Sequence, residues 1–279
     1  MPCAASCLTD LPVREGYVHG YGDREHERLD DQAGALVDLL HHDTSYGEGS
    51  EVLEAGCGTG AQTVILAERC PLARITSVDL SEASLAAAQQ RVAAAGFSNV
   101  TFRSADVYDL PFGPAAFDHV FVCFLLEHLS RPVEAMQALR AVVRPGGTVT
   151  VIEGDAGSAY FHPEDPGAHA AIHCLIDRQA AAGGDALIGR RLYPLLVGAG
   201  FAEVEVSPRF VYADGGRPDM QDRFTRRTFT AMIAGVRDAA LEAGLLDAAA
   251  FDLGIEALHR TAEPDGVFCF TFFKATARG

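Results

Sequence analysis

The chain has 279 residues, 48% hydrophobic and 22% charged, so it is long enough for one large α/β domain with additions and apolar enough to bury a sizeable core. Its net charge of −16 at pH 7 argues against nucleic acid as a partner, because binding to phosphate backbones depends on lysine and arginine. No apolar run reaches the roughly 18 residues that a membrane span needs, and residues 1–7 lack the pattern of a signal peptide. We therefore expect a cytoplasmic protein that contacts no membrane.

Residues 1–45 are predicted to form an N-terminal segment with a helix that covers a ligand. A stretch rich in tyrosine and glycine, 16–23, precedes a polar helix over 24–42. Leucine and alanine residues fall on one stripe of this helix, so we expect it to pack against the rest of the protein by that stripe.

Three glycines at alternate positions follow the first predicted strand. The apolar run 51–55 leads into Gly56, Gly58 and Gly60, and the next ten residues carry apolar side chains at helical spacing. The glycines thus lie where a strand turns into a helix, which is typical of a nucleotide-cofactor turn. Glycine is needed there because a side chain would keep the backbone away from the ligand.

Strands and helices then alternate up to residue 155. The near-continuous apolar strands predict a parallel sheet with helices on both faces, and ligands of such sheets bind beyond the carboxyl ends of the strands. The further strands are predicted over 74–79, 100–105, 117–124 and 148–152. Acidic residues end or follow the strands at Glu54, Asp79, Asp106, Glu127 and Glu153. We expect these five carboxylates to converge on one crevice.

The pattern changes beyond residue 155. Strands predicted near 201–211 and 267–273 are expected to complete a seven-stranded, mostly parallel, Rossmann-like sheet, and helices near 215–263 are expected to form an added cap over a substrate pocket. We therefore expect three parts. They are an N-terminal segment (1–45), a cofactor-binding α/β core (46–155), and a completion of the sheet that carries the cap (156–279).

Glu54 distinguishes between two classes of cofactor. A dinucleotide carries a pyrophosphate, and the usual GxGxxG fingerprint keeps acidic groups away from it. Here the glycines are spaced GxGxG, and Glu54 stands two residues before the first of them. A carboxylate at that place repels pyrophosphate but suits a cofactor with an ammonium and a sulfonium group. Asp79 matches the acid that binds ribose hydroxyls in either class.

The motifs between residues 51 and 155 resemble those of the class I S-adenosylmethionine-dependent methyltransferases. Several motifs occur in the family's order, which is more specific than a lone glycine turn. They are 54–60, 78–81, 105–107 with 110–112, 117–118, 126–128 and 139–147. The remainder of the chain resembles small-molecule methyltransferases in layout only.

The resemblance implies S-adenosylmethionine as the cofactor and assigns residues to it. Glu54 is expected near the ammonium group, Gly56 and Gly58 are expected beside the methionine part, and Asp79 is expected on the ribose hydroxyls. The other expected contacts are Leu80 on the adenine, Asp106 and Val107 at the adenine edge, Phe124 beside the cofactor, and Tyr21 and Arg28 at the carboxylate end.

The expected reaction is in-line transfer of a methyl group from the sulfonium to a small metabolite, with alignment and desolvation supplying much of the rate. A general base is needed only if the nucleophile arrives protonated. The candidate substrate-facing catalytic residues are His162, Glu153, His128 and Tyr160. No set of residues predicts a metal site, and a homodimer is left open.

Alternatives of other kinds stay open at this stage. A methyltransferase for RNA, DNA or protein is one, although residues 123–126 lack the Asn/Asp-Pro-Pro-aromatic tetrad in which methyltransferases of base amino groups resemble one another. An NAD-dependent oxidoreductase is another, disfavoured by Glu54 and by the glycine spacing. A cofactor-binding module without catalysis would carry the same motifs.

Overall fold

The computed structural model describes residue 34 and residues 36–279, and an eight-stranded sheet runs through this part of the chain. The strands are β1 (Glu51–Ala55), β2 (Arg74–Asp79), β3 (Val100–Ser104), β4 (Phe117–Cys123), β5 (Val143–Gly154), β6 (Tyr160–His162), β7 (Ala202–Asp214) and β8 (Val267–Arg278). The strands predicted near 201–211 and 267–273 correspond to β7 and β8, which are both longer than predicted.

Helices connect these strands. The α-helices are α2 (Ala61–Arg69), α3 (Glu82–Ala94), α4 (Pro132–Val142), α5 (Pro166–Ala181), α6 (Leu192–Gly198), α7 (Pro218–Met220), α8 (Ala231–Gly235), α9 (Arg237–Glu242) and α10 (Ala248–Arg260). Three 3₁₀ turns, η1 (Leu126–His128), η2 (Ala156–Ser158) and η3 (Ile188–Arg191), and a π-helix, η4 (Gln221–Thr230), also lie in the described residues. No helix in the described residues has the length and apolar character to cross a membrane.

Local sequence signals define the ends of α3. The Ser81 hydroxyl accepts a hydrogen bond of 3.2 Å from the Ser84 amide, which caps the first turn of the helix. Gly96 follows the last turn with a φ of 82°, a left-handed conformation that glycine adopts without steric cost.

The sheet confirms the Rossmann-like class and contains one strand more than predicted. Strands β3, β2, β1, β4 and β5 lie in that order and are parallel, and β8 is antiparallel to β5. Strand β7 pairs along one edge of β8, whereas β5 and the short β6 share the other edge. The additional strand is β6, whose three residues are too few to show an alternating pattern in the sequence.

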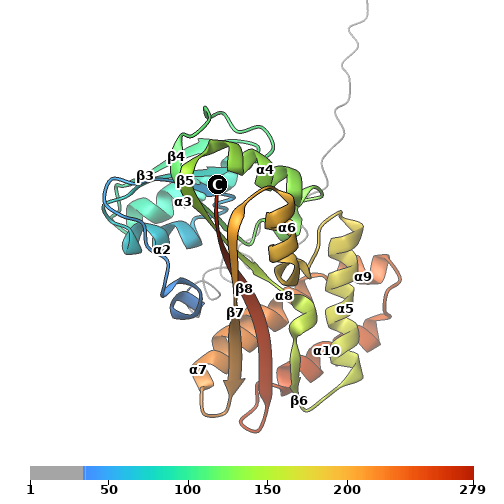
Figure 1. Ribbon diagram of the computed structural model, residues 1–279. Coiled ribbons are helices and arrows are strands. Elements are labelled where there is room, and N and C mark those ends of the chain that lie inside the picture. The colour runs from blue at the N-terminus through green and yellow to red at the C-terminus, as the bar shows by residue number, and fades with distance from the viewer. Residues whose placement is uncertain (1–33, 35) are drawn as a thin grey trace, which may run out of the picture.

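Two apolar clusters cover the two faces of the sheet. On one face, side chains of α2, α5, η4, α8 and α10 pack on the sheet, and α3 packs near the glycine turn. On the other face, α4, η3 and α6 form the second cluster. The helices between β7 and β8 therefore lie on the face that also carries α2 (Figure 1).

Strands β7 and β8 continue beyond the carboxyl end of β5, as Figure 1 shows, and β6 accompanies them. Phenylalanines alternate along this part of β8 and face the added helices. Phe268 is fully buried, and its ring lies 4.7 Å from Phe229 and 6.2 Å from Phe224, both in η4. It also stacks on Phe161 of β6 at 6.1 Å. The added helices are thus attached through an aromatic core.

We expect Phe268→Ala to lower the free energy of unfolding by about 3–5 kcal/mol, because it opens a cavity between η4 and β8. Urea denaturation measures the change. Phe210 of β7 is the matched control because the residue is 45% exposed, and Phe210→Ala should cost less than about 1 kcal/mol. Equal losses in the two variants would contradict this account of how the added helices are held.

Candidate active site

Backbone hydrogen bonds to β2 close the turn between β1 and α2. The amides of Gly56 and Cys57 donate to the Val78 carbonyl at 2.8 and 3.0 Å. The Gly58 amide donates to Oδ2 of Asp79 at 2.9 Å. The glycine turn and the carboxylate predicted for the ribose are therefore in direct contact.

The three glycines of the turn are required for two different reasons. Gly58 has a φ of 51°, and a Cβ there would meet no described atom within 4 Å, so its backbone faces open space. A Cβ on Gly56 would lie 2.8 Å from Cδ1 of Leu125, and one on Gly60 would lie 2.9 Å from Cα of Ala88. Of the three, Gly58 thus offers the backbone to a ligand, while Gly56 and Gly60 allow close packing.

Glu54 is buried beside the turn, on the face of the sheet that carries α2. Its Oε2 accepts hydrogen bonds from the hydroxyls of Thr63 (2.7 Å) and Ser77 (2.6 Å), and only 2% of the residue is exposed. Burial raises the pKa of Glu54 to about 7, against the lowering effect of the two hydroxyls. The carboxyl is therefore close to half ionised at neutral pH, and a nearby cation would favour the ionised form.

The residues predicted for the nucleoside lie at the carboxyl ends of β2 and β3. Oδ1 of Asp79 accepts from the Ser81 amide at 2.9 Å, and since a carboxylate can accept about four hydrogen bonds, Asp79 retains capacity for a ligand. Leu80 is 58% exposed, which leaves an apolar side chain next to that carboxylate. Asp106 accepts from the Tyr108 amide at 3.0 Å, and Val107 beside it is half-buried.

The segment after β4 is bent, and the Glu153 side chain holds it by hydrogen bonds. Phe124, predicted as the last residue of the strand, instead has a φ of 55° and turns the chain. Oε1 of Glu153 accepts from the amides of Leu125 (3.0 Å) and Leu126 (2.7 Å), and the residue is fully buried. Burial and then the neighbouring Glu127 raise the pKa of Glu153 well above its usual range.

The five carboxylates do not share one crevice. Because side chains alternate along β5, Glu153 lies on the same face as Val151 and opposite to Ile152. This is the face that carries α4, and Glu54 lies on the other face. Its contacts are those of a cap for η1.

Glu127 and His128 lie in η1, and Glu127 contacts the end of α5. The Glu127 carbonyl accepts from Nε2 of Gln179 (2.9 Å) and from the Asp185 amide (2.8 Å), and Nε2 of Gln179 lies 3.2 Å from the Glu127 carboxylate. Nε2 of His128 lies 3.6 Å from that carboxylate. His128 lies three residues after Leu125, whose side chain packs on Gly56.

Tyr160 and His162 lie on β6, in the extension of the sheet, and both are exposed. His162 pairs with Val267 and Glu153 pairs with Phe273, six positions apart along β8. At about 3.3 Å per residue, these two candidates are separated by about 20 Å. The four candidate catalytic residues are thus distributed over three places rather than gathered in one.

Two of the predicted site residues lie outside the described part of the chain, and one polar residue near the site was not predicted from the sequence. Tyr21 and Arg28 fall outside the described residues. Gln179 was not singled out from the sequence, although it continues the apolar stripe of Ala168, Ile172 and Leu175 on α5, and a polar residue on such a stripe signals a buried partner. Within the described chain, no group of three His, Cys, Asp or Glu side chains could hold a metal ion.

Comparison with known proteins agrees with this geometry. Residues 52–147 match the family described as methyltransferase domain. The α/β core is thus similar to methyltransferase domains over residues 52–147. It contains the turn, Asp79 and the segment after β4.

Three similar proteins illustrate how far the likeness extends. Demethylmenaquinone methyltransferase of Bacillus subtilis is 28% identical over 150 residues, which is 50% of this chain and 64% of that protein. The 27-O-demethylrifamycin SV methyltransferase of Amycolatopsis mediterranei is 29% identical over 145 residues, 52% of this chain and 53% of that protein. The structure of Haemonchus contortus phosphoethanolamine N-methyltransferase 2 with S-adenosylmethionine has a TM-score of 0.54 at 18% identity and covers 89% of this chain and 52% of that one.

The similarity covers only part of each of these proteins. The chain spans about half to two thirds of the length of these proteins. Because the solved structure is only 18% identical in sequence, its similarity to this chain supports the fold alone.

The raised pKa of Glu54 predicts an unusual dependence of stability on pH. Because the folded state holds this proton up to about pH 7, and the unfolded chain loses it near 4.5, the contribution of Glu54 to stability is present below pH 4.5 and lost as the pH rises through 7. Between pH 5 and 8, the free energy of unfolding of the wild type should fall by about 2.5 kcal/mol relative to Glu54→Gln. Urea denaturation at several pH values tests this, and a constant difference between the two proteins would contradict it.

Proposed function

We propose that this chain is an S-adenosylmethionine-dependent methyltransferase that acts on a small organic molecule. The observation that carries the proposal is the combination of the open Gly58 backbone, the bonded Asp79 carboxylate and the buried Glu54 carboxyl around one turn. These groups fit a cationic nucleoside and do not fit a pyrophosphate, since two carboxyl groups flank the turn. When bound there, S-adenosylmethionine supplies an activated methyl group.

Several residues are proposed to hold the cofactor. Asp79 would bind the ribose hydroxyls, Glu54 would attract the ammonium group, and the exposed Leu80 would pack on the adenine. Gly56, Asp106, Val107 and Phe124 line the neighbouring strand ends. Tyr21 and Arg28 are retained as proposed contacts to the carboxylate end.

For catalysis we rank His128 first among the four candidates. It lies in η1, and its amide donates to the carbonyl of Leu125, the residue that packs on Gly56. If the acceptor arrives protonated, His128 is proposed to remove that proton. Glu153 would act by holding the loop that carries His128. Tyr160 and His162 would contact only a substrate that extends along β6.

The acceptor is proposed to be a small molecule rather than RNA or protein. Two relatives are named as methyltransferases of demethylmenaquinone and 27-O-demethylrifamycin SV. The half-buried Phe124, whose ring lies 5.5 Å from Phe272, supports an acceptor with apolar parts. The net charge of −16 disfavours nucleic acid. We further propose that the protein works in the cytoplasm, with a homodimer as one possible assembly.

Binding experiments test the cofactor assignment directly. Calorimetric titration should detect S-adenosylmethionine and S-adenosylhomocysteine but not NAD. Asp79→Ala should weaken S-adenosylmethionine binding by about 2 kcal/mol or more, because a charged acceptor of two hydroxyls is lost. Unchanged affinity in this variant would remove Asp79 from the site, and preferential binding of NAD would overturn the proposed function. A screen of small molecules for methyl acceptance would follow.

Glu54 should release a proton when the cofactor binds. Its pKa of about 7 should fall beside an ammonium group, so the affinity for S-adenosylmethionine should rise with pH from 6 to 8 and then level off. Calorimetry at pH 6.5 in two buffers of different ionisation enthalpy measures the released protons. Glu54→Gln should bind more weakly and release fewer protons, whereas equal release in both proteins would show that Glu54 takes no part.

A further inference from the structure

Lys274 is a buried lysine whose donors all bind one segment of the chain. It lies on β8, is 3% exposed, and shares a face of the sheet with the phenylalanines that carry the added helices. Nζ donates to the Leu40 carbonyl (3.1 Å), to Oδ1 of Asp43 (2.6 Å) and to the Thr44 hydroxyl (2.7 Å). A lysine ammonium has three donors and no acceptor, so these contacts satisfy it fully.

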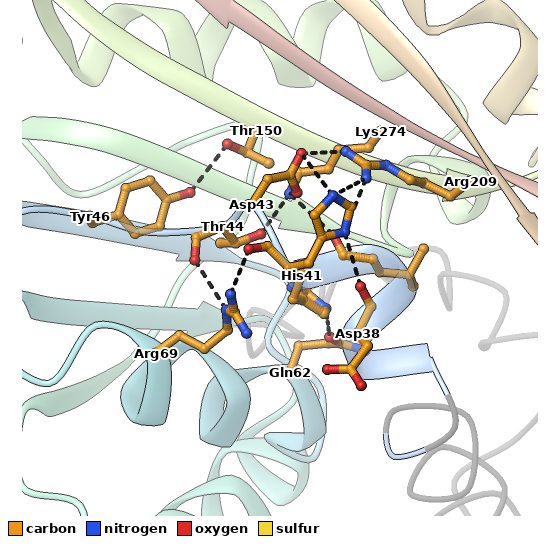
Figure 2. A network of polar contacts seen from close by, with 12 residues as sticks. Asp38, His41, Asp43, Thr44, Tyr46, Gln62, Arg69, Thr150, Arg209 and Lys274 are labelled. Atoms are coloured by element: carbon orange, nitrogen blue, oxygen red, sulfur yellow. Dashed lines mark hydrogen bonds and ion pairs between the residues drawn. The ribbon is translucent and has the colours of Figure 1, made fainter.

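Asp43 receives a second cation from the neighbouring strand. Arg209 of β7 donates to Oδ2 of Asp43, and its Nη1 lies 3.0 Å from Nε2 of His42 (Figure 2). Burial raises the pKa of Asp43, but the hydrogen bonds from Lys274 and Arg209 outweigh this effect and hold the pKa well below its usual range. Strands β7 and β8 together therefore fix residues 40–44.

The same segment is bound to both ends of α2. Nε2 of His41 lies 2.8 Å from Oε1 of Gln62, in the first turn of the helix. Arg69, the last residue of α2, donates to the carbonyls of Thr44 (3.1 Å) and His42 (2.9 Å). Figure 2 shows the segment lying between α2 and the two strands. Since α2 begins directly after Gly60, the segment connects β8 to the helix that continues from the glycine turn.

We propose that Lys274 and Asp43 are positioning residues for the cofactor site, and that they act by fixing α2 and the glycine turn relative to the strands that carry the cap. This inference rests on the proposed function. Stability alone is a weak reason for such a pair, because the cost of desolvating buried charges offsets much of their attraction. A lysine with three acceptors on one segment instead specifies a single placement of that segment.

The test measures two quantities in each variant: the affinity for S-adenosylmethionine and the rate of amide hydrogen exchange in the glycine turn and α2. We expect Lys274→Met to weaken S-adenosylmethionine binding at least tenfold in calorimetry. We also expect faster amide hydrogen exchange in residues 56–69 of the protein without cofactor. Asp43→Asn, at a residue whose side chain is 44% exposed, should weaken binding at least threefold and decides the question if Lys274→Met does not fold.

Glu203→Gln is the matched control. It breaks another ion pair between β7 and β8, Glu203 with Arg278 at 2.6 Å, which does not contact residues 40–44. This control should leave both the affinity and the exchange of residues 56–69 unchanged. If Lys274 and Asp43 have a purely structural role, their variants should be less thermally stable but should keep the wild-type affinity at temperatures well below unfolding. That result would overturn the proposal. An equal effect of Glu203→Gln would also overturn it.

The outcome is separable from the proposed function. If the wild type fails to bind S-adenosylmethionine, the cofactor assignment fails. Hydrogen exchange of residues 56–69 then still decides whether Lys274 and Asp43 position the turn, since it requires no cofactor.

Discussion

Strand β8 is hydrogen-bonded along both of its edges, and the additions to the α/β core are attached through it. One edge holds β5 and β6, the other holds β7 over its full length, and the apolar face carries η4 and its neighbours. The same face presents Lys274 to the segment that contacts α2. The core and the added helices therefore share one rigid strand instead of meeting at a flexible linker.

The carboxyl groups around the turn differ because their surroundings differ. Glu54 is held by two hydroxyls in a dry environment and is easily protonated, whereas Asp79 receives backbone amides at the open end of β2. Glu153 receives amides as well, but it is completely enclosed beneath η1. Residues of the same chemical type thus include a buried acid with a raised pKa, a half-buried acceptor of backbone amides and a structural cap. Their placement relative to the sheet, and not their position at strand ends alone, separates these roles.

The features that depend on local sequence could be predicted, while those that depend on distant contacts could not. The glycine turn, the alternation up to residue 155, and the Ser81 and Gly96 ends of α3 follow from short-range patterns. The three-residue β6 forms only because β8 offers it an edge, and the π-helix η4 has no recognisable spacing in the sequence. The side of the sheet on which Glu153 lies follows from strand alternation, but its bonds to the amides after β4 required the fold. Lys274 was detectable in principle, as a charge that continues the alternation of Phe268, Phe270 and Phe272, but its partners lie more than 200 residues away in the sequence.

The order of the strands along the chain bears on how the protein is made. Strand β8 follows every strand that it pairs with, and its register joins Ile152 to Lys274 across more than a hundred residues. During synthesis, β5 and β7 must therefore wait with unpaired edges until β8 leaves the ribosome, and exposed edges of this kind readily pair with other chains. Loop closure over such a distance is also slow. Yield of folded protein in a cell should consequently depend on chaperones that shield these two edges, and nascent chains that stop before residue 267 should be prone to aggregate.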